Sequence, residues 1–409
     1  MNTEKKDVTG SQTEKRAITR RNFVRGAATV AAVAAAVPLE PMLGGEGSVA
    51  EAAVASYQSN ERAEDSYKYR TGMAKAEKIT VHVQADNGDL ARYSDLSGIY
   101  SKGLLHDALG IPNAAAAQSL ISAFASGEHE DFANIIVGTP GGGPNSRLNG
   151  PQLALAFDLE GLDSHATVIP PAPTVASAQT AAEAVEHYWA ALLADVNFID
   201  YGTDPLVGQA VADLNNLSFL QSPANKEFPY PVTRQNLFRG RFVTGDGNVQ
   251  GPYVSQLMLQ PTFYGAQPLD QRYRTFQSIS GGGSDYMTFV GEYQLVQNGG
   301  DSGRTVVFDP TTRYVRNGRD LAAYTRVDVL YQGYFTAFLV LAGLGAVPNP
   351  GNPYIGSLTE KAFATLGGPD AAGTLAEMAT RALKASWFHK WIVNLRLRPE
   401  EYGALVHAR

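Results

Sequence analysis

The segment 375–391 constrains the fold most, because its residues recur with the period of an α-helix. The positions on this period are Leu375, Met378, Ala379, Ala382, Leu383, Ser386, Trp387, Lys390 and Trp391. Such spacing puts them on one helix face, which is expected to pack against the rest of the protein. Lys390 therefore falls on the predicted buried face, between two tryptophans. Arg398 follows eight residues later, and Pro399 is expected to end the helix near there.

Two further segments have helical patterns. In 178–197 a single apolar stripe is formed by Val185, Tyr188, Trp189, Leu192, Leu193 and Val196. Thr180 and Glu183 fit a capping box at its start. The segment 319–344 is apolar on nearly all sides toward its end, so we expect it to be central to the core.

Long loops separate these helices. Runs rich in Gly, Pro and Asn occupy 141–144, 281–284 and 348–353, and candidate strands are few and short. We therefore predict a mainly α fold, a helical bundle with long loops, over residues 79–409.

Composition excludes several classes of site. The chain has no cysteine, which rules out disulfides, thiolate metal sites, iron–sulfur clusters and cysteine nucleophiles. Its seven histidines are spread out with no His-x3-His pair, and this disfavours a zinc or non-haem iron site. A net charge of −7 gives no general affinity for nucleic acid.

The N-terminus has the pattern of an export signal. Arg20 and Arg21 precede the short apolar run 27–37, and 53–55 offers a small-x-small cleavage site. We interpret 1–55 as a twin-arginine signal, which implies a periplasmic or extracellular location, and 56–78 as a solvated linker. The alternative is a basic stretch before a short Ala-rich helix. The apolar run is too short to span a bilayer.

Lys390 carries the chemical interpretation. A buried lysine is costly unless an anion pairs with it, and Arg396 and Arg398 follow at the same predicted helix end. Forked guanidinium donors beside an ammonium suit an oxyanion such as phosphate or vanadate. In the alternative, Lys390 extends to solvent with its stem on Trp387 or Trp391.

The segment 390–403 resembles the first vanadate-binding motif of the vanadium-dependent haloperoxidases, which belong to the phosphatidic acid phosphatase type 2 superfamily. It has Lys390, seven spacer residues and then Arg398-Pro399-Glu400, and this spacer length is typical of the bromoperoxidase type. Shorter similarities to the family occur in the family's order along most of the chain. They lie at 85–89, 100–107, 183–189, 251–256, 285–287, 297–299, 319–322 and 351–354.

The resemblance implies a vanadate cofactor held by Lys390 and Arg398, with Lys390 also hydrogen-bonding bound peroxide. It implies hydrogen peroxide, a halide and an organic acceptor as substrates, and an oligomer. His407 matches a position near the family's site, which implies a residue that supports the vanadate ligands without binding vanadate itself. The alternative is an exposed terminal residue. Asn394-Leu395 stands where many relatives carry His-Arg, so two polar groups are lost.

The family's second motif, Pro-Ser-Gly-His, and its third motif, which supplies a further arginine and the vanadium-bound histidine, do not occur in this sequence. We therefore expect an N-terminal portion, incomplete relative to the full haloperoxidase fold, with no complete metal ligand set of its own. It would be inactive alone and need vanadate-binding residues from a complementing C-terminal half. The alternatives are an acid phosphatase of the same superfamily and a non-catalytic fragment or subunit of a split enzyme.

Three weaker candidates are interpreted as structural. Glu183 and Glu186 share a helix face but lack a Glu-x-x-His partner, so we expect a solvated face. Residues 86–89 resemble the start of a calcium loop without its final glutamate, and we predict a turn. Residues 138–143 lack the Lys-Ser/Thr of a phosphate loop and should form a flexible loop.

Overall fold

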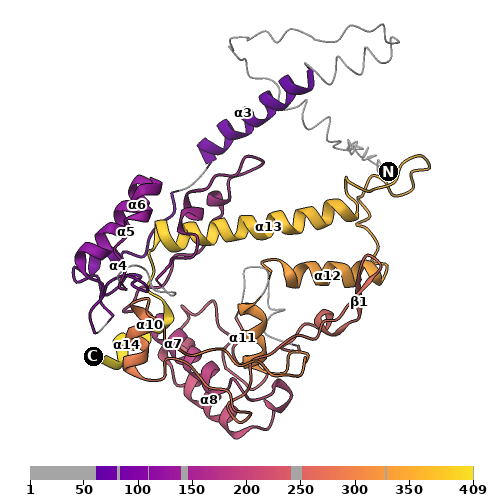
Figure 1. The fold of residues 1–409 in the computed structure, drawn as a ribbon. Coiled ribbons are helices and arrows are strands. Elements are labelled where there is room, and N and C mark those ends of the chain that lie inside the picture. The colour runs from indigo at the N-terminus through magenta and orange to yellow at the C-terminus, as the bar shows by residue number, and fades with distance from the viewer. Residues whose placement is uncertain are drawn as a thin grey trace, which may run out of the picture. The chain divides into compact units, whose positions relative to one another are not determined.

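The computed structural model describes residues 61–80, 83–108, 110–139, 146–240, 251–327 and 329–408. It divides into two units, of which the smaller comprises Met1–Val83 with Phe157–Ala166 and the larger comprises Gln84–Ala156 with Thr167–Arg409. The predicted export signal lies outside the described residues. The described part of the predicted linker forms helix α3 (Arg62–Thr80; Figure 1), most of whose side chains are exposed. It has no apolar stripe, which is why the sequence pattern did not indicate a helix.

The larger unit is mainly helical, and this confirms the predicted fold class (Figure 1). One antiparallel pair, β1 (Thr262–Tyr264) and β2 (Gln267–Leu269), forms its sheet, with Thr262 opposite Leu269. The α-helices are α4 (Asp89–Arg92), α5 (Ala114–Ser126), α6 (His129–Ala133), α7 (Ala178–Leu192), α8 (Pro205–Asn215), α9 (Ser218–Gln221), α10 (Val290–Gln297), α11 (Gly318–Arg326), α12 (Gln332–Gly343), α13 (Gly368–Phe388) and α14 (Pro399–Ala408). No helix in the described ranges is long and apolar enough to cross a membrane.

Helix α7 begins at the predicted residue, Ala178, but has a different cap, and it ends at Leu192, before the predicted end at 197. Its N-cap is Ser177, whose hydroxyl accepts a hydrogen bond from the backbone N–H of Thr180 at 3.1 Å. The predicted capping box of Thr180 and Glu183 is therefore wrong. The Thr180 hydroxyl instead donates to the carbonyl of Thr174 at 2.8 Å, which ties the preceding loop to the helix start.

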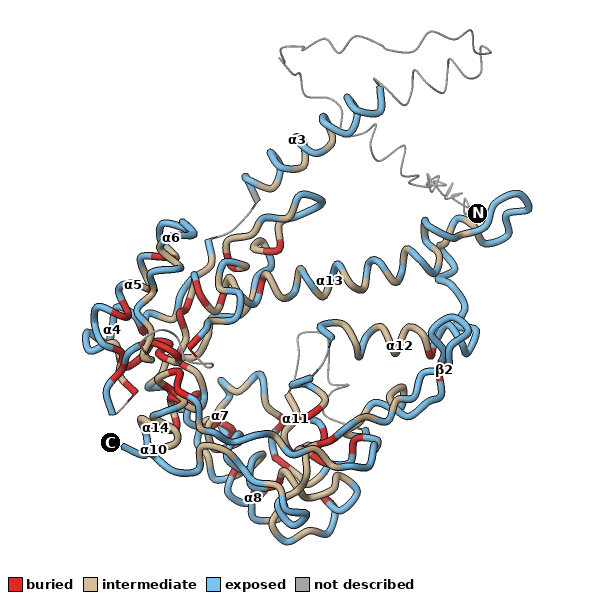
Figure 2. The backbone as a smooth tube through the Cα atoms, in the orientation of Figure 1, coloured by how far each residue is buried: buried red, intermediate tan, exposed pale blue. Residues whose placement is uncertain are grey.

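The predicted helix 319–344 is two helices, α11 and α12. Its expected place at the centre of the core is also wrong, since Val340 is the buried residue of α12 while Tyr334 and Leu344 are 65% and 71% exposed. Helix α12 packs on β1, on the 3₁₀ turn η6 (Gln256–Leu259) and on α13, and most of its residues are partly buried or exposed (Figure 2). Apolar composition on all sides did not distinguish packed faces from exposed ones.

Helix α13 carries the predicted periodic segment but is buried mainly at its C-terminal end. Met378 is 57% exposed, whereas Ala385 and Trp391 are buried. After Phe388 the chain widens into a π-helical turn, η7 (His389–Val393). The helix thus ends before the predicted point, and Pro399 begins α14 instead, a position where its missing N–H leaves no hydrogen bond unmade.

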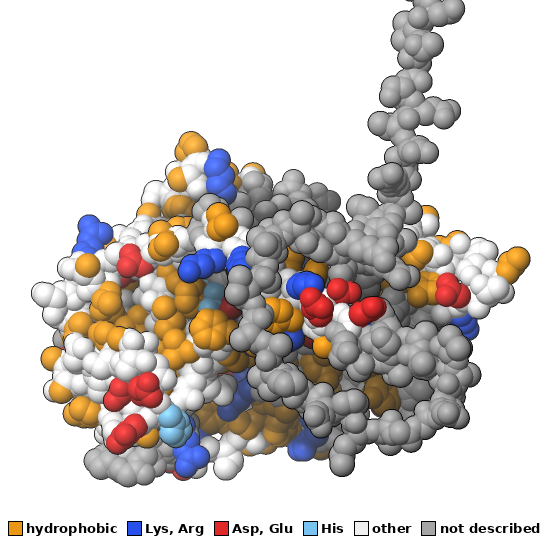
Figure 3. Space-filling view, turned by 90° about the horizontal axis from the view of Figure 1, so that it is seen from above, with side chains coloured by type: hydrophobic (Ala, Val, Ile, Leu, Met, Phe, Trp, Pro, Cys, Tyr) orange, Lys and Arg blue, Asp and Glu red, His pale blue; other side chains and the backbone are white. Residues whose placement is uncertain are grey.

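Two clusters of buried side chains form the core of the larger unit (Figure 2). The first joins α5 to η7, and its members are Ile99, Tyr100, Leu104, Ala116, Ala117, Leu120, Ala154, Trp391 and Leu395. The second lies around α7, α8 and α9 and includes Leu193, Val207 and Leu237. Hydrophobic side chains also reach the surface, as the broad orange areas of Figure 3 show. The first cluster holds the turn that carries Lys390.

Candidate active site

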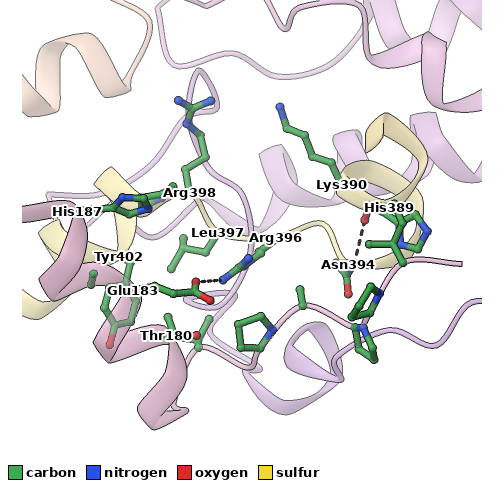
Figure 4. Close-up of a pocket in the computed structure, with 18 of the residues that line it drawn as sticks. Thr180, Glu183, His187, His389, Lys390, Asn394, Arg396, Leu397, Arg398 and Tyr402 are labelled. Atoms are coloured by element: carbon green, nitrogen blue, oxygen red, sulfur yellow. Dashed lines mark hydrogen bonds and ion pairs between the residues drawn. The ribbon is translucent and has the colours of Figure 1, made fainter. Parts of the chain in front are cut away.

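A pocket of about 510 Å³ lies between α7, η7 and the start of α14 (Figure 4). One wall is apolar and rigid, formed by 169–173, where three prolines occur. The opposite wall is polar, and its basic side chains are Lys390, Arg396 and Arg398. The pocket thus combines apolar surface with a few placed charges, as small-molecule sites commonly do.

Lys390 lies half-buried at this pocket among aromatic rings. Its Nζ is 4.5 Å from the ring centre of Trp391, 5.0 Å from that of Trp387 and 5.6 Å from that of Tyr100. Among the described residues, no ion pair includes Lys390. Burial, and next the positive charge of Arg398, lower the pKa of Lys390. The electron-rich ring faces offset part of the cost of holding this cation away from water.

Arg398 points toward the same side of the pocket as Lys390 (Figure 4). Its Nε donates to Glu400 Oε1, which also lies 3.5 Å from Lys102 Nζ. Burial lowers the pKa of Arg398, but the Glu400 carboxylate outweighs this and raises it above the usual value. The structure therefore brings Lys390 and Arg398 together, with one carboxylate attached to the arginine.

Arg396 does not join them. Its guanidinium pairs with Glu183 Oε2 of α7 at 2.9 Å, and it points away from Lys390 (Figure 4). Glu183 is consequently not the purely solvated side chain that we predicted. Burial, followed by the charge of Glu183, raises the pKa of Glu186 to about 7. In the described ranges, no group of three or more His, Asp or Glu residues is arranged to hold a metal ion.

The two positions that depart from the family pattern have structural roles. Asn394 is buried, and its Nδ2 donates to the carbonyl of His389 at 3.2 Å, which closes the π-helical turn. Leu395 adopts a φ of 43° and packs in the core cluster with Trp391. A left-handed backbone at a buried leucine is unfavourable, so the packing of its side chain must hold it there.

The histidines at the pocket are not the one that the sequence indicated. His407 is exposed in the last turn of α14 and does not line the pocket, so its supporting role stays a prediction. His187 and His389 do line it (Figure 4). In the sequence, only its position beside Lys390 could have indicated that His389 lines the pocket. The direction of its side chain depends on the π-helical turn.

The remaining candidates behave as structural features. Residues 86–89 form the predicted turn, in which Asp86 accepts from the N–H of Gly88 and Gly88 has a φ of 75°. Asp89 is buried and accepts from the N–H of Val175 at 2.9 Å, next to the proline wall. Of the predicted loop 138–143, residues 140–143 lie outside the described residues.

These residues fit an oxyanion. In the part of the chain that the structure describes, the Lys390 ammonium has no carboxylate partner, and the Arg398 guanidinium is paired with Glu400. Both groups face the same opening, so the pocket has an excess of positive charge beside apolar walls. A tetrahedral anion with several oxygen acceptors matches the forked donors of Arg398 and the single charge of Lys390. Vanadate and phosphate both have this chemistry.

Comparisons with known proteins agree on one group. The chain is 32% identical over 357 residues, 85% of its length and 62% of the relative's, to a vanadium-dependent bromoperoxidase of Ascophyllum nodosum. It is 28% identical over 366 residues, 75% of its length and 60% of the relative's, to one of Corallina pilulifera. No family model matches the chain.

A solved structure matches as well. It is the homohexameric structure of the second vanadate-dependent bromoperoxidase of Ascophyllum nodosum, with a TM-score of 0.76 and 29% identity, covering 91% of this chain and 61% of that one. The chain thus spans about three fifths of the length of the relatives it matches. Sequence and fold agree over most of this chain. The chain therefore belongs to the vanadium-dependent haloperoxidase superfamily.

Proposed function

We propose that this protein is a vanadium-dependent haloperoxidase, which uses hydrogen peroxide to oxidise bromide or another halide. The observation that carries the proposal is the convergence of Lys390 and Arg398 on one pocket in a chain of this fold. The names of its relatives, vanadium-dependent bromoperoxidases, support the same activity.

The residues of this chain would bind and orient the cofactor. When bound, vanadate activates peroxide for attack by a halide as a Lewis acid, without changing its own oxidation state. Arg398 would donate to its oxygens through the guanidinium N–H groups that Glu400 does not use. Lys390 would stay protonated beside the rings and donate a hydrogen bond to an oxygen of the anion or of peroxide. The apolar wall at 169–173 would exclude water and receive an organic acceptor.

Further contacts to the cofactor are proposed to come from the family's second and third motifs, which residues 1–409 do not contain. The polypeptide of this sequence is then expected to bind an oxyanion weakly but to show no measurable bromination of a phenol acceptor with vanadate and peroxide. Bromination by the purified polypeptide alone would disprove this dependence on further motifs.

Oxyanion binding is the direct test of the site. We expect Lys390→Met to weaken binding of orthovanadate, measured by titration calorimetry, by about tenfold, because a charge-assisted hydrogen bond is lost. Lys361→Met is the matched control, since Lys361 is exposed and outside the pocket. Equal affinities for the wild type and Lys390→Met would refute the oxyanion site. Hydrolysis of a phosphomonoester without bromide oxidation would instead select the phosphatase of the same superfamily.

We also propose that the protein forms an oligomer, because the solved structural relative is homohexameric. Light scattering of the purified protein would give its mass directly. A monomer at micromolar concentration would contradict this proposal.

A further inference from the structure

Glu401 is a buried carboxylate beside the proposed oxyanion site that the proposed chemistry does not use. It lies in the first turn of α14 and is 1% exposed. Its Oε1 accepts hydrogen bonds from Gln297 Nε2 at 2.6 Å, from Ser101 N at 3.0 Å and from Ser101 Oγ at 3.2 Å. Its Oε2 accepts from the backbone N–H of Arg398 at 2.8 Å. Both oxygens are therefore occupied by donors from the protein.

These donors come from three parts of the chain that are distant in sequence. Ser101 follows Tyr100, Gln297 ends α10, and Arg398 precedes α14. A single carboxylate thus links the loop that carries Tyr100 to the backbone of Arg398.

The linked segments are the ones that support the two cations. Tyr100 is one of the rings against the Lys390 ammonium, and it packs edge-on against Trp391 at 4.6 Å. Its N–H donates to the carbonyl of Leu395 at 3.0 Å, and Ile99 pairs with Arg396 in an isolated β-bridge. A shift of residues 99–101 would therefore move the Tyr100 ring that contacts Lys390. It would also move the backbone of Leu395 and Arg396, which leads to Arg398.

Burial of a carboxylate is costly unless several donors satisfy it, and a hydrophobic residue would fill the same space at lower cost. Burial raises the pKa of Glu401 to about 7, although the N–H donors of Arg398 and Ser101 oppose this rise. The adjacent Glu400 has a different contact, because it binds the Arg398 side chain and not its backbone. The two glutamates therefore act on different parts of the same arginine.

We infer that Glu401 is a positioning residue of the oxyanion site. By accepting from Arg398 N, Ser101 and Gln297 together, it sets the distance between the Arg398 guanidinium and the Lys390 ammonium, so that both reach one tetrahedral anion. This inference rests on the proposed function, since it concerns the site that Lys390 and Arg398 form.

The test is the affinity of the full chain with Glu401→Gln for orthovanadate. It is measured by calorimetry and by tryptophan fluorescence, to which Trp387 and Trp391 beside Lys390 contribute two of the three tryptophans. A glutamine side chain has an accepting oxygen and a donating NH2 group. It therefore cannot accept both from Arg398 N and from the Ser101 and Gln297 donors. We expect about tenfold weaker binding, the size typical of losing a residue that orients a ligand. Glu401→Asp keeps the charge but is one methylene shorter, and we expect it to recover part of the affinity. Glu377→Gln, an exposed glutamate on α13, is the matched control and should bind like the wild type.

Thermal unfolding of each variant separates positioning from a merely structural role. A lower unfolding temperature with unchanged orthovanadate affinity in Glu401→Gln would overturn the inference. If Glu401→Gln does not fold, Ser101→Ala takes its place, because it removes one donor alone. Here about twofold to threefold weaker binding is expected from the loss of one of several hydrogen bonds, and unchanged affinity overturns the inference. Absence of orthovanadate binding by the wild type would instead refute the proposed function.

Discussion

Lys390, Arg396 and Arg398 lie close together in the sequence, but each has a different partner. Aromatic rings surround Lys390, Glu183 pairs with Arg396, and Glu400 pairs with Arg398. An exogenous anion in the pocket would therefore meet Lys390, which has no carboxylate partner within the described ranges. It would also meet Arg398, for which it competes with Glu400. At the residue scale, the carboxylates of the protein decide how much positive charge the pocket presents.

The ion pair between Arg398 and Glu400 leads to a prediction about Glu400. Glu400→Gln removes the negative charge at Arg398 and keeps a neutral acceptor, so orthovanadate should bind about threefold more tightly, as expected from one partly exposed ion pair. Calorimetry at constant ionic strength measures the change. Glu360→Gln, in an exposed loop, is the control. Weaker binding in Glu400→Gln would mean that Glu400 orients Arg398 more than it competes with the anion.

Glu186 makes stability depend on pH. It faces the apolar side chains of Leu214 and Leu220, and its pKa in the folded protein, about 7, exceeds its ordinary value of 4.5. The unfolded chain therefore loses this proton at lower pH than the folded one. The stability that neutral Glu186 contributes is present below about pH 4.5 and is lost as the pH rises through 7.

Glu186→Gln should remove this loss. The rise of the pKa from 4.5 to about 7 corresponds to about 3 kcal/mol, and partial solvent access reduces this, so we expect about 1 kcal/mol of added stability at pH 8 and little at pH 4.5. Urea unfolding at the two pH values measures it, with Glu360→Gln as control. An equal effect at both pH values would show that Glu186 is not titrating as described.

At the scale of elements, local hydrogen bonds decided the helix ends. Ser177 starts α7, Asn113 starts α5, and Asp204 followed by Pro205 starts α8. The π-helical turn at the end of α13 is closed by Asn394 on His389, and it turns Lys390 toward the pocket. The boundaries that matter for the site are therefore set by single side chains.

The cap of α7 gives a prediction at this scale. Ser177→Ala should lower the free energy of unfolding by about 1 kcal/mol, because the N–H of Thr180 loses its acceptor. Chemical denaturation measures the loss. Ser218→Ala is the control, since Ser218 is exposed at the first position of α9 and its hydroxyl has no partner among the described residues. Equal stabilities for the two variants would contradict the assignment of the cap.

At the scale of the whole molecule, the first core cluster couples the loop at 99–104 to the turn at 389–395. The site is thus a property of the assembled fold, because its parts come from opposite ends of the larger unit's sequence.

Export also belongs to this scale and concerns residues outside the described ranges. We predict that replacing Arg20 and Arg21 with Lys retains the precursor in the cytoplasm, because lysine lacks the planar fork of the guanidinium. Cell fractionation followed by immunoblotting measures the retained fraction, with Arg16→Lys as control. Normal exported yield from the double variant would disprove a twin-arginine signal.

Periodicity and residue type were enough to predict the helical class and the helix that leads to Lys390. Both predictions rest on local spacing, which a sequence displays directly. The oxyanion site formed by Lys390 and Arg398 stays a prediction. Periodicity and residue type failed for α12, because apolar residues on every side of this helix do not reveal which side is covered.

The partners of the charges were decided by the tertiary structure alone. Arg396 meets Glu183 across 213 positions of sequence, and Glu401 meets Ser101 across 300. Helix spacing carries no information about such pairs, because they form only when the core brings distant segments together. The sequence by itself determined which chemical groups the site contains, and the packing of the core determined which of them are left to bind an anion.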